Sequence, residues 1–319
     1  MTPFTNHPQW PAIEAIHKKL SSEGFRSLIA GGAVRDLLLQ RSPNDIDIAT
    51  DARPEQVEAL FEKTVMVGKA FGVSRVIVRG QDVEVATFRK DGPYRDGRKP
   101  ESIEYSSMEE DAKRRDFTMN ALFYDIDKKE IIDFVEGQKD IMKKIIRTVG
   151  IAEKRFEEDK LRILRAVRFH AQLGFPIEQH TADAIRKYSI MIHQVSMERV
   201  RDEWEKILQA EQAVSGFGRA HDLGLWTPLF GSWKYESEEY KKLFDLNKDK
   251  DSEVLWILWF LIHCQESKEK LAELGLHWKL SKKTIQKLID FTFAEVDGES
   301  VIPHIIGLTE EAFELWTQY

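Results

Sequence analysis

The sequence has little of several features that mark particular classes of protein. Cys264 is the only cysteine among 319 residues, which excludes an internal disulfide framework and a cysteine-rich zinc site. No apolar run approaches the length of a membrane span, since the most apolar stretch, around residues 254–263, is short. The N-terminus has no basic region followed by an apolar stretch, so no secretion signal is indicated. We therefore predict a cytoplasmic protein without a membrane partner.

The chain also lacks a positive net charge: 47 Lys and Arg against 54 Asp and Glu give a formal net charge of −7, although binding to nucleic acid rewards Lys and Arg. The charges are unevenly distributed, however. Between Gly137 and His170 there are ten Lys and Arg residues and only five Asp and Glu residues. The acidity of the whole chain therefore does not exclude an RNA ligand.

The pattern of the chain changes along its length. In the first part, short β-branched runs alternate with amphipathic stretches, which is typical of a small α+β domain. Helices are predicted at 13–20, 33–39 and 54–61, strands at 27–30, 45–49, 121–125 and 130–134, and a hairpin at 74–78 and 83–88 with its turn at 80–82. Later, helical spacing prevails, at 157–169, 181–188 and 198–208. We predict an α+β head with a mixed sheet (1–147), an all-α neck (148–210) and an all-α body (211–319).

Two adjacent glycines, Gly31 and Gly32, lie between a predicted strand and a predicted helix, and Arg35 follows one turn into that helix. A glycine turn of this kind lets the backbone approach an anion closely, and the first amides of the helix then point at a phosphate. Taken alone, paired glycines at the end of a strand are more often an ordinary tight turn.

Two aspartates follow about ten residues later. Alternation along the predicted strand places Asp45 and Asp47 on the same face. Carboxylates held side by side repel each other unless cations bind between them, and two metal ions at such a pair activate an attacking hydroxyl and stabilise a leaving pyrophosphate. A solvent-facing edge strand is the alternative for an isolated pair. Glu84 alternates with apolar neighbours on a later strand and is a candidate third carboxylate, or else an exposed strand residue.

Together these features resemble the class II tRNA nucleotidyltransferase and bacterial poly(A) polymerase family, within the polymerase-β-like nucleotidyltransferases. Further segments match the family's later motifs in order, at 114–121, 133–140, 155–169 and 198–203. The resemblance implies a catalytic head in which Mg²⁺ binds Asp45 and Asp47, with Glu84 assisting. It also implies nucleotide-binding roles, which fall on Gly32, Arg35 and Arg115 for the triphosphate and on Asn120 for the sugar side.

The fourth motif contains Asp159 and Arg162, which stand three residues apart and are therefore predicted to be neighbours on one helix face. An aspartate accepts from an exocyclic amino group and an arginine donates to a ring acceptor, so the pair fits cytosine and adenine and rejects guanine and uracil. In the family such a pair selects CTP and ATP. The alternative is an ion pair on a solvated helix. Arg165 and Arg168 extend a cationic stripe, which the resemblance assigns to the nucleotide and which an acidic partner surface would also explain.

The resemblance further implies the substrates: the tRNA 3′ end, ATP and CTP, with no obligate protein partner. Residues 89–100 are similar to the flexible loop of members that add the terminal A, a loop that CC-adding members largely lack. After about residue 210 the likeness fades, and the chain is shorter than members with a full helical tail; Trp256, Trp259, Trp278 and Trp316 are predicted to be core residues. Three alternatives remain: an enzyme adding only A, a poly(A) polymerase, and a catalytically silent RNA-binding protein.

Overall fold

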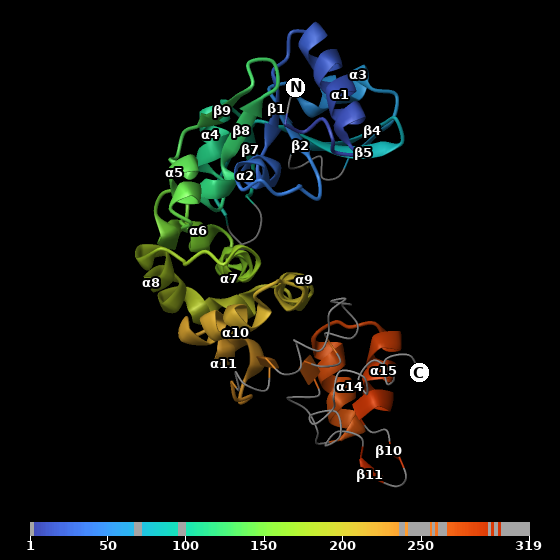
Figure 1. Cartoon of the computed structure of the whole chain (residues 1–319), viewed down its shortest axis with the longest axis vertical. Coiled ribbons are helices and arrows are strands. Elements are labelled where there is room, and N and C mark those ends of the chain that lie inside the picture. The colour runs from blue at the N-terminus through green and yellow to red at the C-terminus, as the bar shows by residue number, and fades with distance from the viewer. Residues whose placement is uncertain are drawn as a thin grey trace. The chain divides into compact units, whose positions relative to one another are not determined.

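The computed structural model describes residues 3–66, 72–94, 100–235, 240–241, 256, 259–260, 267–292, 295–296 and 299–300 (Figure 1). The chain forms two compact units. The first contains residues 1–159 and 176–181, and the second contains residues 160–175 and 182–319. The chain therefore passes from one unit to the other three times.

A seven-stranded sheet forms the centre of the first unit, in the order β3-β4-β5-β2-β1-β8-β9. Its strands are β1 (Ser27–Ala30), β2 (Asp47–Thr50), β3 (Thr64–Met66), β4 (Val73–Val78), β5 (Gln81–Thr87), β8 (Leu122–Asp125) and β9 (Glu130–Asp133). Strands β2 and β5 are parallel and the other neighbours are antiparallel. The sheet is therefore mixed, which confirms the predicted α+β class of the head.

The first unit also contains short helices. They are α1 (Trp10–Ser22), α2 (Gly32–Leu38), α3 (Pro54–Leu60), α4 (Met108–Lys113), α5 (Gly137–Met142), α6 (Ala152–Glu158) and the 3₁₀ helix η2 (Thr118–Asn120). Helices α1 and α3 pack on β4 and β5, whereas α2 contacts β1, β8, η2 and α5 (Figure 1). Helix α1 buries Ile13, Ile16 and Leu20 along one face, the spacing expected of an amphipathic helix.

Strand β2 begins two residues later than predicted, so Asp45 lies just before the strand rather than in it. The strand cannot begin earlier because the N–H of Ile46 does not bond to a neighbouring strand. It donates instead to the side-chain Oε1 of Gln9 at 2.9 Å. Ile46 and Ile48 are nevertheless both buried, as expected of residues that alternate with the two aspartates.

The predicted hairpin is present, but its turn is at Arg79 and Gly80 rather than at 80–82, because Val78 pairs with Gln81. Both turn residues have positive φ, 52° and 74°, as a two-residue turn between right-twisted strands requires. The predicted loop at 89–100 begins with strand β6 (Arg89–Asp91), which pairs with β7 (Ile103–Tyr105); residues 95–99 lie outside the described part. These strands, like β3, are three residues long and too short to show alternation.

The second unit is mainly helical. Its elements include α7 (Leu161–Leu173), most of α8 (Gln179–Tyr188), η3 (Ser189–Gln194), α9 (Met197–Leu208), α10 (Ala213–Asp222), α11 (Trp226–Phe230), α14 (Lys268–His277) and α15 (Lys282–Thr292). One short hairpin, β10 (Glu295–Val296) with β11 (Glu299–Ser300), departs from the predicted all-α body.

An aromatic cluster forms the core of the second unit. The fully buried ring of Trp204 lies 4.8 Å from that of Phe230 and 5.2 Å from that of Trp259. Trp256, Trp259 and Trp278 are all buried, which confirms the predicted core role. Trp316 lies outside the described residues.

The single helix predicted at 157–169 is wrong, because α6 ends at Glu158 and α7 begins at Leu161. Between them Asp159 has extended backbone angles, φ −144° and ψ 107°. Three successive carboxylates, at 157–159, are unfavourable at a helix C-terminus and favourable just before the N-terminus of the next helix, which explains the break. Asp159 and Arg162 are therefore not neighbours on one helix face.

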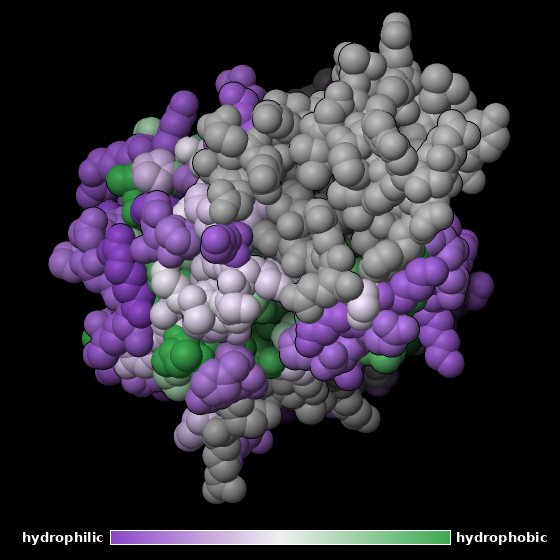
Figure 2. Space-filling view, turned by 90° about the horizontal axis from the view of Figure 1, so that it is seen from below, coloured by the Kyte–Doolittle hydropathy of each residue, from purple (hydrophilic) through white to green (hydrophobic). Residues whose placement is uncertain are grey.

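In the part of the chain that the structure describes, no helix is both long enough and apolar enough to span a membrane. On the face shown in Figure 2, hydrophilic residues predominate among the described ones, and hydrophobic residues appear in small separate groups.

Candidate functional site

The glycine turn lies where β1 ends and α2 begins. Gly31 has φ 75° and ψ −129°, a conformation that only glycine adopts readily, and its N–H donates to the carbonyl of Leu122 at 3.0 Å. A Cβ at this position would lie 3.1 Å from Nη1 of Arg115. Glycine is therefore needed here for two reasons, the backbone angle and the close approach of the Arg115 guanidinium.

Arg35 and Asn120 face each other across this turn. The Nη1 of Arg35 donates to the side-chain Oδ1 of Asn120 at 2.8 Å, and its Nε and Nη2 donate to the carboxylate of Asp36 at 2.8 and 3.0 Å. The amide of Asn120 donates in turn to Asp116 at 3.2 Å. Asn120 is thus held from both ends, with its oxygen toward Arg35.

Arg115 is fixed on three sides. Its Nε and Nη2 donate to Oδ2 of Asp111 at 3.2 and 3.0 Å, and its Nη1 donates to the backbone carbonyl of Asn120 at 3.2 Å. The guanidinium also lies over the ring of Phe123, 5.0 Å from its centre. The structure therefore brings Arg115, Asn120, Arg35 and the glycine turn together.

The carboxylates lie beside the same turn because of the strand register. Asp47 pairs with Ala30, the last residue of β1 before Gly31. On the other side of β2, Ile48 pairs with Val85 in a parallel ladder, so the preceding residues, Asp47 and Glu84, lie at neighbouring positions on the same face. A phosphate bound at Gly31 would thus have carboxylates next to it.

The electrostatics of Asp47 reflect this crowding. Burial is the largest cause that raises the pKa of Asp47, and the negative charges of Asp45 and Glu84 raise it further, while Arg115 lowers it. The resulting pKa is about 7, far above the ordinary value of 3.8. At neutral pH the carboxylate therefore gains strongly from any cation that binds it.

These oxygen donors suit Mg²⁺, which prefers carboxylate oxygens and typically uses one or two of them, with water and substrate phosphates completing the shell. Among the described residues, no group of three or more His, Cys, Asp or Glu side chains is arranged to hold a metal ion. Asp45, Asp47 and Glu84 thus do not supply a complete set of metal ligands. Two carboxylates suffice where phosphate oxygens of the substrate also coordinate the ion.

In the second unit, two arginines of α7 meet a buried acid of α9. The Nε of Arg168 lies 2.6 Å from Oε2 of Glu203, and Nη1 of Arg165 lies 4.0 Å from Oε1 of the same residue. Glu203 and the nearby Arg162 of α7 are both largely buried. Glu203 therefore supplies a negative charge that compensates the cationic stripe formed by these arginines. The sequence had placed Glu203 only within the last of the family's motifs, at 198–203.

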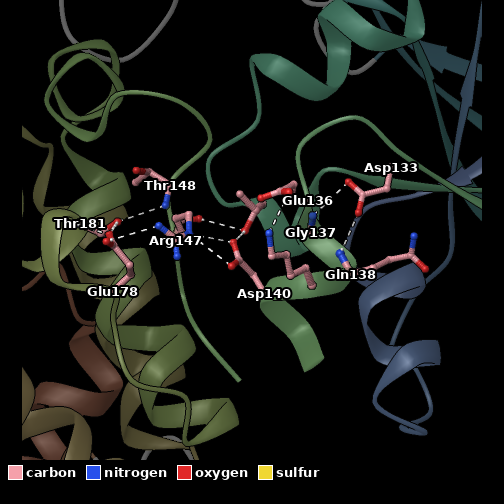
Figure 3. A network of polar contacts seen from close by, with 11 residues as sticks. Asp133, Glu136, Gly137, Gln138, Asp140, Arg147, Thr148, Glu178 and Thr181 are labelled. Atoms are coloured by element: carbon pink, nitrogen blue, oxygen red, sulfur yellow. Dashed lines mark hydrogen bonds and ion pairs between the residues drawn. The ribbon is translucent and has the colours of Figure 1, made fainter. Parts of the chain in front are cut away.

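Figure 3 shows a polar network built on the third motif. Asp133 accepts from the N–H groups of Val135, Gly137 and Gln138 at 2.9–3.0 Å and so caps α5. Within α5, Asp140 accepts from the hydroxyl of Thr118 at 2.8 Å. Thr118 is the first residue of η2, and η2 ends at Asn120. The third motif (133–140) therefore holds the second motif (114–121) in place.

The same network continues into the segment 176–181 (Figure 3). Arg147 donates to Asp140 at 3.1 Å and lies 3.4 Å from Glu178. Glu178 accepts from the backbone N–H of Thr181 at 2.9 Å, and the Thr181 hydroxyl accepts from the N–H of Thr148 at 3.3 Å. Polar contacts thus tie this separate segment to the rest of the first unit.

Sequence reasoning missed Asp111. Its carboxylate is buried and holds both Arg114 and Arg115. The signal was present in the spacing, since an acid three and four residues before two arginines faces both of them on a helix.

Two family models match the chain: the poly A polymerase head domain over residues 27–147, and a probable RNA and SrmB-binding site of polymerase A over residues 174–235. A CCA-adding enzyme of Bacillus pumilus is 40% identical over 286 residues, which cover 89% of this chain and 70% of that protein. A CCA-adding enzyme of Leuconostoc citreum is 36% identical over 309 residues, covering 96% of this chain and 74% of that protein.

The chain is also similar to solved structures of CCA-adding enzymes. The Bacillus stearothermophilus CCA-adding enzyme in complex with CTP is 34% identical and superimposes with a TM-score of 0.66, covering 89% of this chain and 78% of that one. The Thermotoga maritima CCA-adding enzyme complexed with tRNA shares the fold, with a TM-score of 0.73 at 21% identity over 98% of this chain and 82% of that one.

Proposed function

Because the chain belongs to the family of CCA-adding enzymes and bacterial poly(A) polymerases, as its motifs predicted, we propose that it transfers CMP and AMP from CTP and ATP to the 3′ end of tRNA and releases pyrophosphate. The observation that carries the proposal is the meeting of Asp47 and Glu84 with the glycine turn and Arg115 in one place. A pair of carboxylates beside a cationic phosphate cradle is what phosphoryl transfer needs.

Asp45 and Asp47 would hold Mg²⁺, and Glu84 would assist by adding negative charge from the middle of the neighbouring strand β5. When bound, the ion would neutralise charge that develops at the reacting phosphate and favour the ionised form of the attacking hydroxyl.

The protein's own part is to position the nucleotide. Gly32, Arg35 and Arg115 would bind the triphosphate, and Asn120, held by Arg35 and Asp116, would contact the sugar side. The RNA 3′-hydroxyl attacks the α-phosphate in line, and the arginines stabilise the leaving pyrophosphate. Orientation and preorganised charge supply the rate enhancement.

Asp159 and Arg162 would select the base, although each lies at the end of a different helix. Asp159 follows α6, and Arg162 lies in the first turn of α7. Arg165 and Arg168, oriented by Glu203, would extend the nucleotide-binding surface.

Arg162→Ala is expected to relax base choice before it removes chemistry. Loss of one donor to the base edge should reduce discrimination against UTP and GTP by about 10- to 100-fold, since a good bidentate pair is worth about 1–3 kcal/mol. The check is the ratio of kcat/KM for CTP to that for UTP, with Arg186→Ala, an exposed arginine paired with Asp183, as the control. Unchanged selectivity in the Arg162 variant would contradict the base-reading role.

We further propose that residues 1–147, 148–210 and 211–319 act as the catalytic head, the base-selecting neck and the RNA-binding body, and that the protein works in the cytoplasm, where mature tRNA is used.

The test is a product assay with purified protein, Mg²⁺, CTP and ATP on three RNAs: tRNA lacking CCA, tRNA ending in C-C, and an unstructured oligomer. Addition of three nucleotides to the first RNA supports the proposal. One A added only to the second would make this an A-adding enzyme, and long A tails on the oligomer a poly(A) polymerase. No extension of any RNA would overturn the proposal and favour an RNA-binding role.

A further inference from the structure

A buried carboxylate of α4 holds two neighbouring guanidinium groups. The side chain of Asp111 is only 2% exposed; its Oδ1 accepts from Nε of Arg114 at 2.8 Å, and its Oδ2 accepts from Nε and Nη2 of Arg115 at 3.2 and 3.0 Å. Two donors from one guanidinium to one carboxylate fix the plane of the Arg115 group as well as its position. Asp111 therefore determines where Arg115 points.

A second buried carboxylate lies at the other side of Arg114. Asp91, in β6, has a side chain that is 6% exposed; its Oδ1 accepts from Nε of Arg89 at 2.9 Å and its Oδ2 from the hydroxyl of Tyr94 at 2.7 Å. The Nη1 of Arg114 lies 3.9 Å from Oδ2 of Asp91. Asp91 thus fixes the beginning of the segment between β5 and α4, and Arg114 joins it to Asp111.

The charges along this row alternate: Asp91, Arg114, Asp111, Arg115. Burial would raise the pKa of Asp111, but the charges of Arg115 and Arg114 and their hydrogen bonds outweigh it, so the pKa lies below its ordinary value. Asp111 is therefore ionised at neutral pH, as its ion pairs with Arg114 and Arg115 require.

We propose that Asp111 and Asp91 are positioning residues for nucleotide addition: Asp111 directs Arg115 toward the triphosphate, and Asp91, acting through Arg114, makes that direction depend on the segment that follows β5. The proposal rests on the proposed function, because Arg115 is the residue that would bind the triphosphate. An arginine released from its partner samples many rotamers, and a displacement of about 1 Å at a reacting centre costs about 100-fold in rate.

A purely structural role is the alternative, since Asp111 also accepts from the backbone N–H of Arg89 at 3.3 Å. The two roles differ in one respect. A residue that acts through Arg115 loses its effect on catalysis once Arg115 has been changed, whereas a residue that merely stabilises the fold does not.

The experiment is a double-mutant cycle in the full chain, with kcat and KM for ATP measured on tRNA ending in C-C. Asp111→Asn is expected to lower kcat by about 10- to 100-fold, with a much smaller change in KM. The positive charge of Arg115 remains in the variant, and only the orientation of its guanidinium is lost. Combined with Arg115→Lys, it should add little to the loss that Arg115→Lys causes alone. Additive losses in kcat would overturn the proposal.

The outer link has its own variant and control. Asp91→Asn should lower kcat less than Asp111→Asn and should also be non-additive with Arg115→Lys, while Glu109→Gln, an exposed acid of α4 paired with Lys113, should leave kcat unchanged. If Asp111→Asn does not fold, as judged by circular dichroism, the Asp91 cycle decides in the same way. Wild-type protein without activity on any RNA would refute the proposed function, whereas active wild type with additive losses would refute this inference alone.

Discussion

Asp47→Asn is expected to abolish nucleotide addition and, in metal-free protein at pH 8, to raise the melting temperature. The loss of activity follows from the loss of an anionic ligand at the phosphate, and we expect a fall in kcat of about a thousandfold or more, because charge neutralisation there contributes several kcal/mol. Extension of tRNA lacking CCA by wild type and variant, at saturating Mg²⁺, measures it.

The gain in stability follows from the raised pKa of Asp47. A carboxyl whose pKa is about 7 in the folded state and 3.8 in the unfolded state stabilises the fold fully below pH 3.8, and this contribution is lost as the pH rises through 7. At pH 8 the ionised carboxylate therefore costs on the order of 4 kcal/mol relative to its protonated form. Asparagine removes that charge, so the variant should melt several degrees higher than wild type at pH 8, and the difference should become smaller at pH 5 and vanish only below pH 3.8.

Two comparisons make the result specific. Asp82→Asn removes an acid from the same strand as Glu84, but this acid is half-exposed and paired with Arg75, so neither activity nor melting temperature should change much. Added Mg²⁺ should raise the melting temperature of the wild type and not that of the Asp47 variant. Retained activity in Asp47→Asn would refute the metal role, and an unchanged melting temperature at pH 8 would refute the electrostatic account.

Gly137→Ala is expected to destabilise the first unit by about 3 kcal/mol or more, at the upper end of what overpacking usually costs. A Cβ at Gly137 would overlap the carbonyl oxygen of Thr118, and it would lie 2.9 Å from the carbonyl carbon. The atoms in the way belong to backbone and not to the end of a flexible side chain, so they yield only if η2 moves. Because η2 ends at Asn120, activity at a temperature well below the melting point should fall as well.

Urea unfolding of Gly137→Ala and wild type measures the loss of stability. Lys139→Ala, two residues along the same helix, removes only an exposed side chain paired with Glu136 and serves as the control. A Gly137→Ala protein as stable as the wild type would show that α5 does not pack against η2 as described.

Much of the candidate site follows from local patterns in the sequence. The glycines at the end of β1 and the acids at the start of β2 could be predicted together because an antiparallel pair of neighbouring strands places them side by side. Glu84 could be proposed only from alternation, since its place beside Asp47 depends on a parallel pairing between strands far apart in sequence. No single-segment pattern reveals such a register.

Other features could not be predicted from periodicity. Helical spacing continues through 157–169, so it gave one helix where the structure has two; the run of acids at 157–159, weighed against the helix dipole, was the only local sign of the break. Similarly, Glu203 appears in sequence as one charge among many on α9. Its pairing with Arg168 is a tertiary contact that only the packing of α7 against α9 creates.

The segment 176–181 has a consequence for the way the protein is made. This segment supplies both backbone hydrogen-bond partners of Ile146. The N–H of Ile146 donates to the carbonyl of Pro176, and its carbonyl accepts from the N–H of Glu178, both at 2.9 Å. A nascent chain that has emerged only as far as residue 159 therefore lacks the backbone partners of Ile146, and Arg147 lacks Glu178 while it keeps Asp140. The N-terminal unit becomes complete only when residue 181 has left the ribosome, after the whole of α7 has been synthesised, so a fragment ending at 159 should fold less well than one ending beyond 181.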